Sequence, residues 1–345
     1  MRSLAALTVA SVAAASSCGL KLENLVTFGD SWTDTGRLGY FINNDGNAPP
    51  AGEPIPESSV TATGGLAWGQ FVANETGARY YNYAVSGAVT SDDIIKRQFD
   101  LIGRPFPSVL DYQVPAFEAD IAAGTLFDDR RADNTLYALW IGTNDLGYGA
   151  FLSDTQTAGA TLSTFIDSIW TIFDRLYKAG GRHFVLFNEG PLEDSPLYAP
   201  IQDGGFGDSN FWNNKTAYNT TEYSGKMLQY TTSVNTLFDY GVPFQLLVRN
   251  RWPDARITIY DVHSLMREIR AKPEKYLSEP VNVEDVYRVC TPSTGQCVDS
   301  SNPPSSFMWF DELHHSERTA EIIAEHFVPV AYGKSPFATT YSGAH

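Results

Sequence analysis

Residues 25–36 read LVTFGDSWTDTG, an apolar run that stops abruptly at a Gly-Asp-Ser turn. Residues 25–28 are apolar or β-branched and predict a buried strand, which cannot continue through the turn. In parallel α/β sheets, ligands bind at the carboxyl ends of the strands, where a small residue leaves the next side chain exposed. Ser31 is therefore our candidate nucleophile. Gly-Asp-Ser is also an ordinary turn sequence, so the assignment requires a base, an acid and oxyanion donors elsewhere in the chain.

Apolar runs of strand length alternate with segments of helical periodicity along the chain. This alternation is typical of a parallel sheet with helices on both faces. We therefore predict a three-layer α/β/α sandwich on a central five-stranded parallel sheet, with residues 20–345 forming a single domain. The expected strands are residues 25–28, 80–85, 135–141, 183–187 and 257–261, and the expected helices are residues 66–75, 112–123, 161–179, 223–240, 263–272 and 317–327.

The N-terminus has the pattern of a secretory signal peptide, with Met1-Arg2 followed by an apolar run from Leu4 to Ala15 and then small residues. We place cleavage after Gly19, so that residues 1–19 are the leader, and expect a secreted, extracellular protein. No run reaches the length that a membrane-spanning helix needs. The formal net charge of −16 argues against nucleic acid as a partner, because its phosphates would repel such a surface.

Removal of residues 1–19 leaves two cysteines, Cys290 and Cys297, around a short loop. In an oxidising compartment this pair predicts a disulfide, since no third or fourth soft ligand lies near enough to form a metal site. Three sequons begin at Asn74, Asn214 and Asn219 and fit N-glycosylation of a secreted chain.

His314 is the candidate base for Ser31. A serine hydroxyl is unreactive near neutral pH without a base, and the chain has six histidines. Asp311 precedes His314 by three residues. On a tight bend, that spacing places the carboxylate beside the imidazole, where it orients the ring and stabilises its charged form. In the alternative interpretation, His314 and His315 are exposed surface residues in front of a helix.

The oxyanion that forms when a serine attacks an ester carbonyl needs preorganised donors. The backbone N–H groups of Ser31 and Gly87 and the side-chain amide of Asn144 are the candidates, because each follows an expected strand. A glycine at 87 allows the backbone to approach the substrate closely. Taken singly, Gly87 and Asn144 are more often turn residues. The joint occurrence of all these groups at expected strand and helix ends favours the catalytic interpretation.

In four separated blocks the sequence resembles the SGNH, or GDSL, hydrolase superfamily. The blocks are Gly29-Asp30-Ser31, Gly87, Gly142-Thr143-Asn144-Asp145 and Asp311-Glu312-Leu313-His314. The resemblance implies a flavodoxin-like α/β/α fold and esterase activity without cofactor or metal. It also implies that Ser31, Asp311 and His314 are the catalytic triad and that Ser31, Gly87 and Asn144 are the oxyanion donors. The leader, sequons and aromatic loops look most like those of secreted fungal acetylesterases of carbohydrate esterase family 16.

Two positions depart from the family pattern. Many members have Pro and Thr after the catalytic His, where this chain has His315 and Ser316. Arg37 stands where many relatives have Asn. The spacing from Asp311 matches His314 rather than His315, so His314 remains the predicted base.

The expected substrate is a short-chain ester of a carbohydrate, mainly an acetyl ester such as an acetylated hemicellulose oligosaccharide. Trp32, Trp68 and Trp212 are candidate substrate contacts, together with Asp30 beside the nucleophile, because indole rings can stack on sugar faces. Each tryptophan could equally belong to the core, and we expect Trp140, at a strand end, to do so.

Two other functions are compatible with these residues. The first is a secreted lipase or phospholipase of the same superfamily acting on longer acyl chains, although no amphipathic segment with an apolar exposed face stands out. The second, of a different class, is a carbohydrate-binding protein that has kept the fold and lost catalysis, although none of the predicted catalytic residues is missing. We expect a monomer that acts on a small ester or an oligosaccharide ester.

Overall fold

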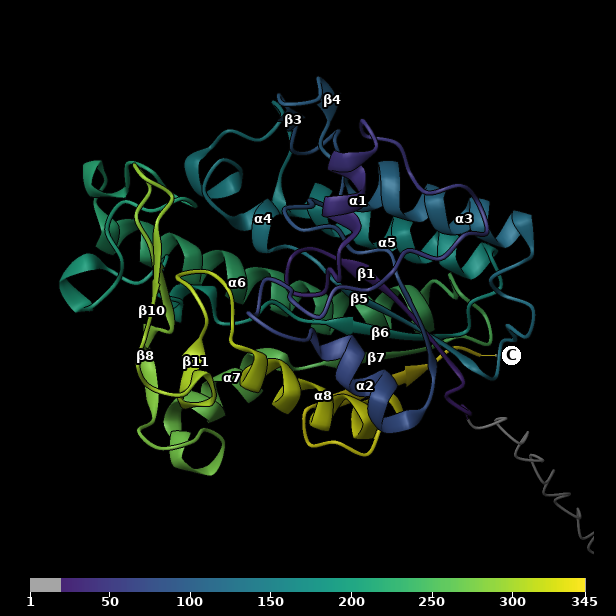
Figure 1. Cartoon of the computed structure of the whole chain (residues 1–345). Helices are drawn as coiled ribbons and strands as arrows, with labels where there is room; N and C mark the ends of the chain where they lie inside the picture. Colours follow the sequence, from purple (N-terminus) through teal and green to yellow (C-terminus); the bar gives the residue numbers. More distant parts are fainter. Residues whose placement is uncertain (1–19, 345) are drawn as a thin grey trace, which may run out of the picture.

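A six-stranded sheet forms the middle layer of the computed structural model, which describes residues 20–344 (Figure 1). The predicted leader, residues 1–19, lies outside the described residues. The strand order is β12-β7-β6-β5-β1-β2, and every neighbouring pair is parallel except β12 with β7. The strands are β1 (Asn24–Gly29), β2 (Arg79–Asn82), β5 (Thr135–Trp140), β6 (His183–Phe187), β7 (Arg256–Tyr260) and β12 (Ala338–Ser342).

The predicted parallel α/β sheet is confirmed. Strands β1 and β5 show why the sequence pattern predicted it. Every residue of β1 and of β5 is buried, and the two strands pair in parallel with Leu25 opposite Leu136. A parallel strand covered on both faces is a continuous apolar run, which is the pattern that residues 25–28 and 135–141 carry.

The strand count is the point on which the prediction was wrong. The sheet has six strands rather than five, because β12 adds an antiparallel strand to the edge beside β7. Residues 338–342 read ATTYS, and none of them is fully buried. An edge strand that is half exposed has no continuous apolar run to reveal it.

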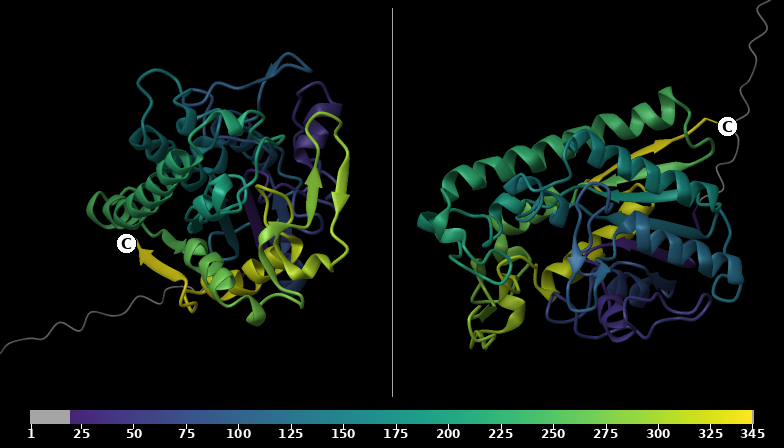
Figure 2. Two further views of the ribbon diagram at one scale, coloured as in Figure 1. Left: turned by 90° about the vertical axis from the view of Figure 1, so that its left-hand side faces the viewer. Right: turned by 90° about the horizontal axis from the view of Figure 1, so that it is seen from above.

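Helices cover both faces of the sheet, which confirms the three layers. In Figure 1, α3, α5 and α6 lie on one side of the sheet, and α2, α7 and α8 lie on the other. Figure 2 shows α6, a helix of 24 residues, running along one side of the molecule. The helices are α1 (Arg37–Asn43), α2 (Trp68–Thr76), α3 (Val114–Ala123), α4 (Thr143–Leu146), α5 (Leu162–Lys178), α6 (Thr220–Pro243), α7 (Val262–Ala271) and α8 (Glu317–Ala331).

Helix α5 illustrates how the sequence specifies these layers. The side chain of Thr161 accepts a hydrogen bond from the backbone N–H of Thr164 and so caps the first turn. Phe165, Ile169 and Ile172 repeat at helical spacing and are fully buried against the sheet. The helix ends where Gly180 takes a positive φ of 98°.

Irregular segments and two of the three small sheets of residues 20–344 lie toward the left of Figure 1, and the third small sheet lies at its top. The longest irregular segment is residues 188–219, between β6 and α6. The short strands are β3 (Gln98–Phe99), β4 (Arg104–Pro105), β8 (Asn282–Val286), β9 (Arg288–Cys290), β10 (Cys297–Asp299) and β11 (Phe307–Trp309), and the short helical turns are η1 (Val109–Gln113), η2 (Phe151–Ser153), η3 (Leu192–Asp194), η4 (Ile201–Asp203), η5 (Lys215–Ala217), η6 (Phe244–Val248), η7 (Pro273–Lys275) and η8 (Pro304–Ser306).

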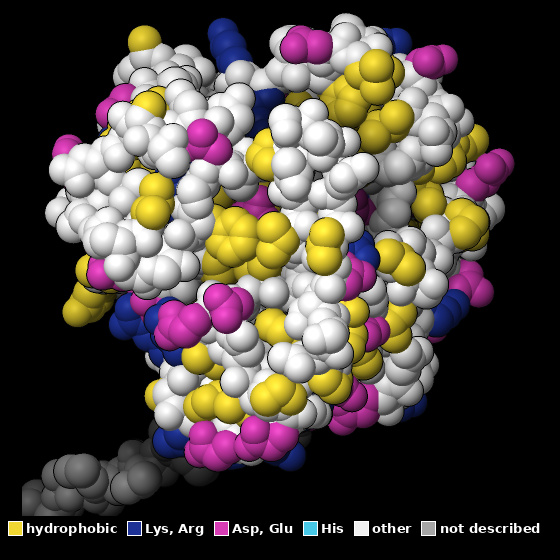
Figure 3. Space-filling model, turned by 60° about the vertical axis from the view of Figure 1, so that its left-hand side comes forward, with side chains coloured by type: hydrophobic (Ala, Val, Ile, Leu, Met, Phe, Trp, Pro, Cys, Tyr) yellow, Lys and Arg dark blue, Asp and Glu magenta, His cyan; other side chains and the backbone are white. Residues whose placement is uncertain are grey.

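The surface drawn in Figure 3 carries acidic side chains in many separate places and hydrophobic side chains in several small groups. Among residues 20–344, no helix is both long and apolar enough to cross a membrane.

Candidate active site

Ser31 lies just beyond the carboxyl end of β1, the strand between β5 and the edge strand β2. The turn needs a glycine before it, because Gly29 has φ of 154° and a Cβ there would lie 2.2 Å from the backbone oxygen of Trp140. The side chain of Gln113 brackets this glycine: its Oε1 accepts from Gly29 N at 3.0 Å and its Nε2 donates to Gly29 O at 2.7 Å. The nucleophile is therefore presented by a backbone that is held on both sides.

His314 and Asp311 complete a continuous hydrogen-bonded chain with Ser31. His314 Nε2 is 2.8 Å from Ser31 Oγ, although the two residues are 283 positions apart in the sequence. On the other side of the ring, Nδ1 is 3.0 and 2.9 Å from the two carboxylate oxygens of Asp311. The predicted nucleophile, base and acid are thus brought together in the order that base-assisted attack requires.

A local turn holds Asp311 and His314 in register. Asp311 Oδ1 also accepts from the backbone N–H groups of Leu313, at 2.9 Å, and of His314, at 2.7 Å. Phe310 N donates to His314 O at 2.8 Å and closes the turn. The spacing of three residues is therefore the spacing of a tight turn that one carboxylate organises.

The pKa values of these two side chains shift in opposite directions. Burial alone would raise the pKa of Asp311, but the attraction of His314 and the hydrogen bonds that the carboxylate accepts lower it. Burial alone would lower the pKa of His314, but the attraction and hydrogen bond of Asp311 outweigh it and raise the pKa. The pair thus favours an ionised Asp311 and an imidazole that accepts a proton readily.

His315, the residue that departs from the family pattern, has a different environment. Its ring is fully buried against Trp32 and Trp140, with ring centroids 4.9 and 5.8 Å away. Neither ring nitrogen has a hydrogen-bond partner among the described residues, and burial lowers the pKa of His315 to about 3. Only His314 of this pair contacts the candidate nucleophile.

Gly87 and Asn144 lie beyond β2 and β5, on the same edge of the sheet as Ser31. Asn144 Nδ2 donates to Ala88 O at 3.0 Å, which places the amide beside the Gly87 turn. Gly87 has a positive φ of 85°, and Arg97 Nη1 donates to its carbonyl oxygen. Both residues are only half buried, so a substrate oxygen can reach them.

Asp30 is placed behind the site rather than on its surface. It is 1% exposed, and its Oδ2 lies 3.4 Å from Asn144 Nδ2 while Oδ1 accepts from Trp32 N. Burial raises the pKa of Asp30 to about 7. The expectation that Asp30 contacts substrate is therefore corrected, because its carboxylate faces Asn144 and the turn of Ser31 instead of solvent.

The three tryptophans expected to stack on sugars are also buried, and the prediction is wrong for each of them. Trp32 is 1% exposed and packs edge-on against Trp140, which is in the core as expected. Trp68 is fully buried, and its Nε1 donates to Thr33 Oγ1 at 3.1 Å. Trp212 is 1% exposed and stacks on Tyr148 at 4.9 Å. Their large apolar rings stabilise the fold instead of forming open platforms.

Two residues that sequence reasoning did not single out help to hold the site. Asp34 accepts hydrogen bonds from the backbone N–H groups of Gly36, Arg37 and Ser86, and so links the segment after Ser31 to the segment before Gly87. Arg97 binds the carbonyl of Gly87. Asp34 could have been found from its place three residues after Ser31, whereas Arg97 lies in an irregular segment with no local signal.

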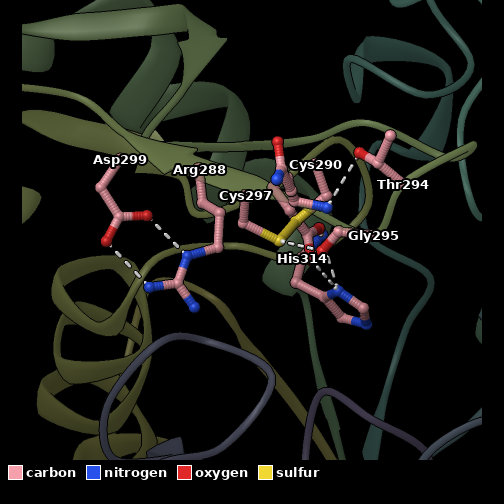
Figure 4. The surroundings of a disulfide bond; sticks show 9 residues. Arg288, Cys290, Thr294, Gly295, Cys297, Asp299 and His314 are labelled. Carbon is pink, nitrogen blue, oxygen red and sulfur yellow. Dashed lines mark hydrogen bonds and ion pairs between the residues drawn. A yellow bond between two sulfur atoms is a disulfide. The ribbon is translucent and has the colours of Figure 1, made fainter.

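The predicted disulfide between Cys290 and Cys297 is present and joins β9 to β10 (Figure 4). Arg288 N donates to Phe310 O at 2.7 Å, which ties this hairpin to the segment just before Asp311. Asn74, Asn214 and Asn219 are exposed, as glycosylation requires, and their glycosylation stays a prediction. Within residues 20–344, no group of three or more His, Cys, Asp or Glu side chains is arranged to hold a metal ion.

The sequence model of the GDSL-like lipase/acylhydrolase family matches residues 25–327. The chain belongs to this family. This GDSL family member is a carboxylic ester hydrolase. Its matched segment contains all four blocks that carry Ser31, Gly87, Asn144 and His314.

Among its relatives is an acetylesterase of Hypocrea jecorina, 46% identical over 315 residues, or 91% of this chain and 90% of the relative. An acetylesterase of Thermothelomyces thermophilus is 31% identical over 188 residues, or 52% of this chain and 57% of the relative. A solved structure of an acetylxylan esterase from Geobacillus stearothermophilus has a TM-score of 0.40 at 14% identity, and the match covers 91% of this chain and 95% of that one.

Proposed function

We propose that this ester hydrolase is a secreted serine acetylesterase that removes acetyl groups from carbohydrates through an acyl-enzyme intermediate. The observation that carries the proposal is the unbroken hydrogen-bonded chain from Ser31 Oγ through the imidazole of His314 to Asp311. Such a chain is the arrangement by which a serine hydroxyl becomes nucleophilic.

In the first half-reaction, Ser31 Oγ attacks the acetyl carbonyl carbon while His314 Nε2 takes the hydroxyl proton. The developing imidazolium is stabilised by Asp311, which lies 2.9 Å from Nδ1. His314 then gives the proton to the departing sugar oxygen, and the acetyl group remains on Ser31. A water molecule, activated by the same imidazole, releases acetate in the second half-reaction.

The negative oxygen of each tetrahedral intermediate requires the donors beside Ser31. We assign this role to the backbone N–H groups of Ser31 and Gly87 and to Asn144 Nδ2. Asn144 uses one amide hydrogen in its 3.0 Å bond to Ala88 O. Its contact with Asp30 is long, at 3.4 Å, so the second hydrogen is available to a substrate oxygen.

Two observations support acetyl esters of sugars over other esters. The Hypocrea jecorina relative, which is 46% identical over nine-tenths of the chain, is named an acetylesterase. The leader pattern of residues 1–19 and the sequons at Asn74, Asn214 and Asn219 fit a protein that works outside the cell, where acetylated plant polysaccharides are found.

The first experiment tests the chemistry. Wild-type protein is assayed on 4-nitrophenyl acetate beside Ser31→Ala, with circular dichroism to show that the variant is folded. We expect Ser31→Ala to lose activity by roughly 10⁴-fold or more, because the nucleophile acts as a unit with His314 and Asp311. Equal activity of the two proteins contradicts the mechanism, and no activity in either supports a non-catalytic binding protein.

The second experiment tests the substrate. Acetylated xylo-oligosaccharides are incubated with wild type or Ser31→Ala and analysed by mass spectrometry. We expect wild type alone to release acetate and to lower the mass of the oligosaccharide stepwise, by one acetyl group for each ester cleaved. Faster cleavage of long-chain 4-nitrophenyl esters than of the acetate identifies a lipase instead.

A further inference from the structure

Two partly exposed phenylalanines lie beside the candidate site, on two different loops. Unlike the buried tryptophans, their rings are open to a ligand. Phe211 comes from the long segment between β6 and α6, and Phe106 comes from the segment after β4. We propose that Phe211 contacts the sugar part of the ester and that Phe106 limits the length of the acyl part. This selectivity rests on the proposed acyl transfer at Ser31.

Phe211 is presented directly against the candidate base. Its ring centroid is 5.3 Å from that of His314 with the planes at 74°, and 38% of the residue is exposed. Its neighbour Trp212 points into the body of the protein and is 1% exposed. The backbone N–H groups of both residues contact Ser209 Oγ at 3.3 Å. Trp212 thus anchors the loop, and Phe211 is the ring that remains open to a ligand.

The position of Phe211 assigns it to the alcohol side of the ester. The imidazole that takes the proton from Ser31 must return it to the departing oxygen, so that oxygen binds within hydrogen-bond reach of His314 Nε2. The sugar attached to this oxygen therefore lies next to the imidazole. A ring that packs edge-on against the same imidazole borders the space that the sugar occupies.

Phe106 lies against the candidate oxyanion donor Gly87. A Cβ built on Gly87 would be 2.8 Å from Phe106 Cζ, so the aromatic ring occupies the space that a side chain would need. The guanidinium of Arg97 lies over the Phe106 ring, 5.1 Å from its centroid, and also binds Gly87 O. Phe106 N donates to Arg97 O at 2.9 Å, which fixes the ring beside the turn.

The geometry of an ester carbonyl assigns Phe106 to the acyl side. Three directions leave the carbonyl carbon: its oxygen points to the oxyanion donors, the alkoxy oxygen points to His314, and the acyl chain takes the remaining direction. That direction leads away from the imidazole and past the donors. The half-buried ring of Phe106 stands beside Gly87, and in this proposal it sterically limits acyl chains longer than acetyl.

The test of Phe211 compares two acetate esters that differ only in the alcohol. For Phe211→Ala we expect the KM for acetylated xylo-oligosaccharides to rise roughly tenfold with kcat largely retained, because a ring-stacking contact of ordinary strength is lost. On methyl acetate, whose alcohol is too small to reach the ring, we expect KM to change by less than about twofold. An effect of the substitution on the imidazole itself would instead lower kcat by the same factor on both esters. Phe211→Tyr keeps a ring at this place and is expected to restore the wild-type KM.

The test of Phe106 compares two acyl groups on one alcohol. For Phe106→Ala we expect the ratio of kcat/KM on 4-nitrophenyl butyrate to that on the acetate to rise roughly tenfold, because two more methylene groups can be buried. The KM for acetylated xylo-oligosaccharides is expected to change little. Phe106→Leu, which keeps the site filled, serves if the alanine variant does not fold and is expected to show a smaller increase.

Phe244→Ala is the matched control, since Phe244 is 46% exposed and follows the far end of α6. It is expected to leave both selectivities unchanged. A wild type that cleaves no acetate ester contradicts the proposed function itself. If wild type is active and both alanine variants keep its selectivities within about twofold, this inference alone is contradicted. If Phe211→Ala instead changes the selectivity for the acyl group and Phe106→Ala the selectivity for the alcohol, the assignment of the two sides is overturned.

Discussion

The turn that carries Ser31 and the turn that carries His314 meet at one site but are held by different kinds of contact. Gly29, before Ser31, is held by residues distant in sequence, with Gln113 on both of its backbone groups and the backbone of Trp140 against its Cα. The turn of His314 is held by Asp311, three residues away. The catalytic pair of the second turn is therefore oriented by contacts within four residues, whereas the first turn depends on contacts with distant segments.

The largest expected effect comes from removing the negative charge of Asp311 while keeping the hydrogen bonds that hold its turn. Asp311→Asn keeps an oxygen for the backbone N–H groups of Leu313 and His314 but no longer stabilises an imidazolium. We expect kcat/KM on 4-nitrophenyl acetate to fall roughly 10⁴-fold. The melting temperature should change little, and a loss of activity below tenfold would show that Asp311 is not the orienting acid.

The next largest effect is expected at Asn144, the candidate oxyanion donor that follows β5 in the sheet. Asn144→Ala removes a donor held by Ala88 O and is expected to lower kcat by roughly 10²–10³-fold with little change in KM, since an oxyanion donor acts mainly in the transition state. Steady-state kinetics on the acetate give both constants. A raised KM with an unchanged kcat would place Asn144 in substrate binding instead.

A smaller effect, on stability, is expected from removing the hydrogen bonds between the Gln113 side chain and Gly29, which precedes Ser31 by two residues. Gln113→Leu has a similar volume but leaves Gly29 N–H without its buried partner, so the free energy of unfolding should fall by roughly 1–3 kcal/mol. Urea denaturation measures this change. Gln296→Leu, at an exposed position, is the control and should stay within about 0.5 kcal/mol of wild type. Equal stability of the two variants would show that the hydrogen bonds from Gln113 to Gly29 do not stabilise the fold.

The smallest expected effect is a shift in the midpoint of the pH dependence of kcat/KM. Protonated His314 cannot accept the proton of Ser31, so kcat/KM should fall as the pH drops through the pKa of His314. Because Asp311 raises that pKa, we expect the midpoint above the ordinary histidine value of 6.5. The carboxylate of Glu312 also raises it, so Glu312→Gln should move the midpoint to lower pH. A midpoint below 6.5 in wild type contradicts the coupling to Asp311.

Particular elements show how far sequence reasoning reaches. β1 and β5 were predicted because a strand buried on both faces is one unbroken apolar run. The edge strand β12 was missed because its residues are partly exposed and alternate in no clear way. His314 was chosen over His315 by its spacing from Asp311, and the structure places only His314 against Ser31.

The aromatic residues were the least predictable part of the site. Trp212 and Phe211 are neighbours in one irregular loop, yet one ring is buried under Tyr148 and the other lies on His314. Loop residues have no period from which a buried face can be read. Which of two adjacent rings is exposed depends on the side chains that other segments place over them.

The amino-acid sequence alone determined the layered sheet and the candidate triad, because strand periodicity and the spacing of a tight turn are local properties of the chain. Only the tertiary structure decided that Asp30 and three tryptophans are enclosed while Phe106 and Phe211 remain partly open. Exposure is set by contacts between segments far apart in sequence, and no local pattern encodes those contacts.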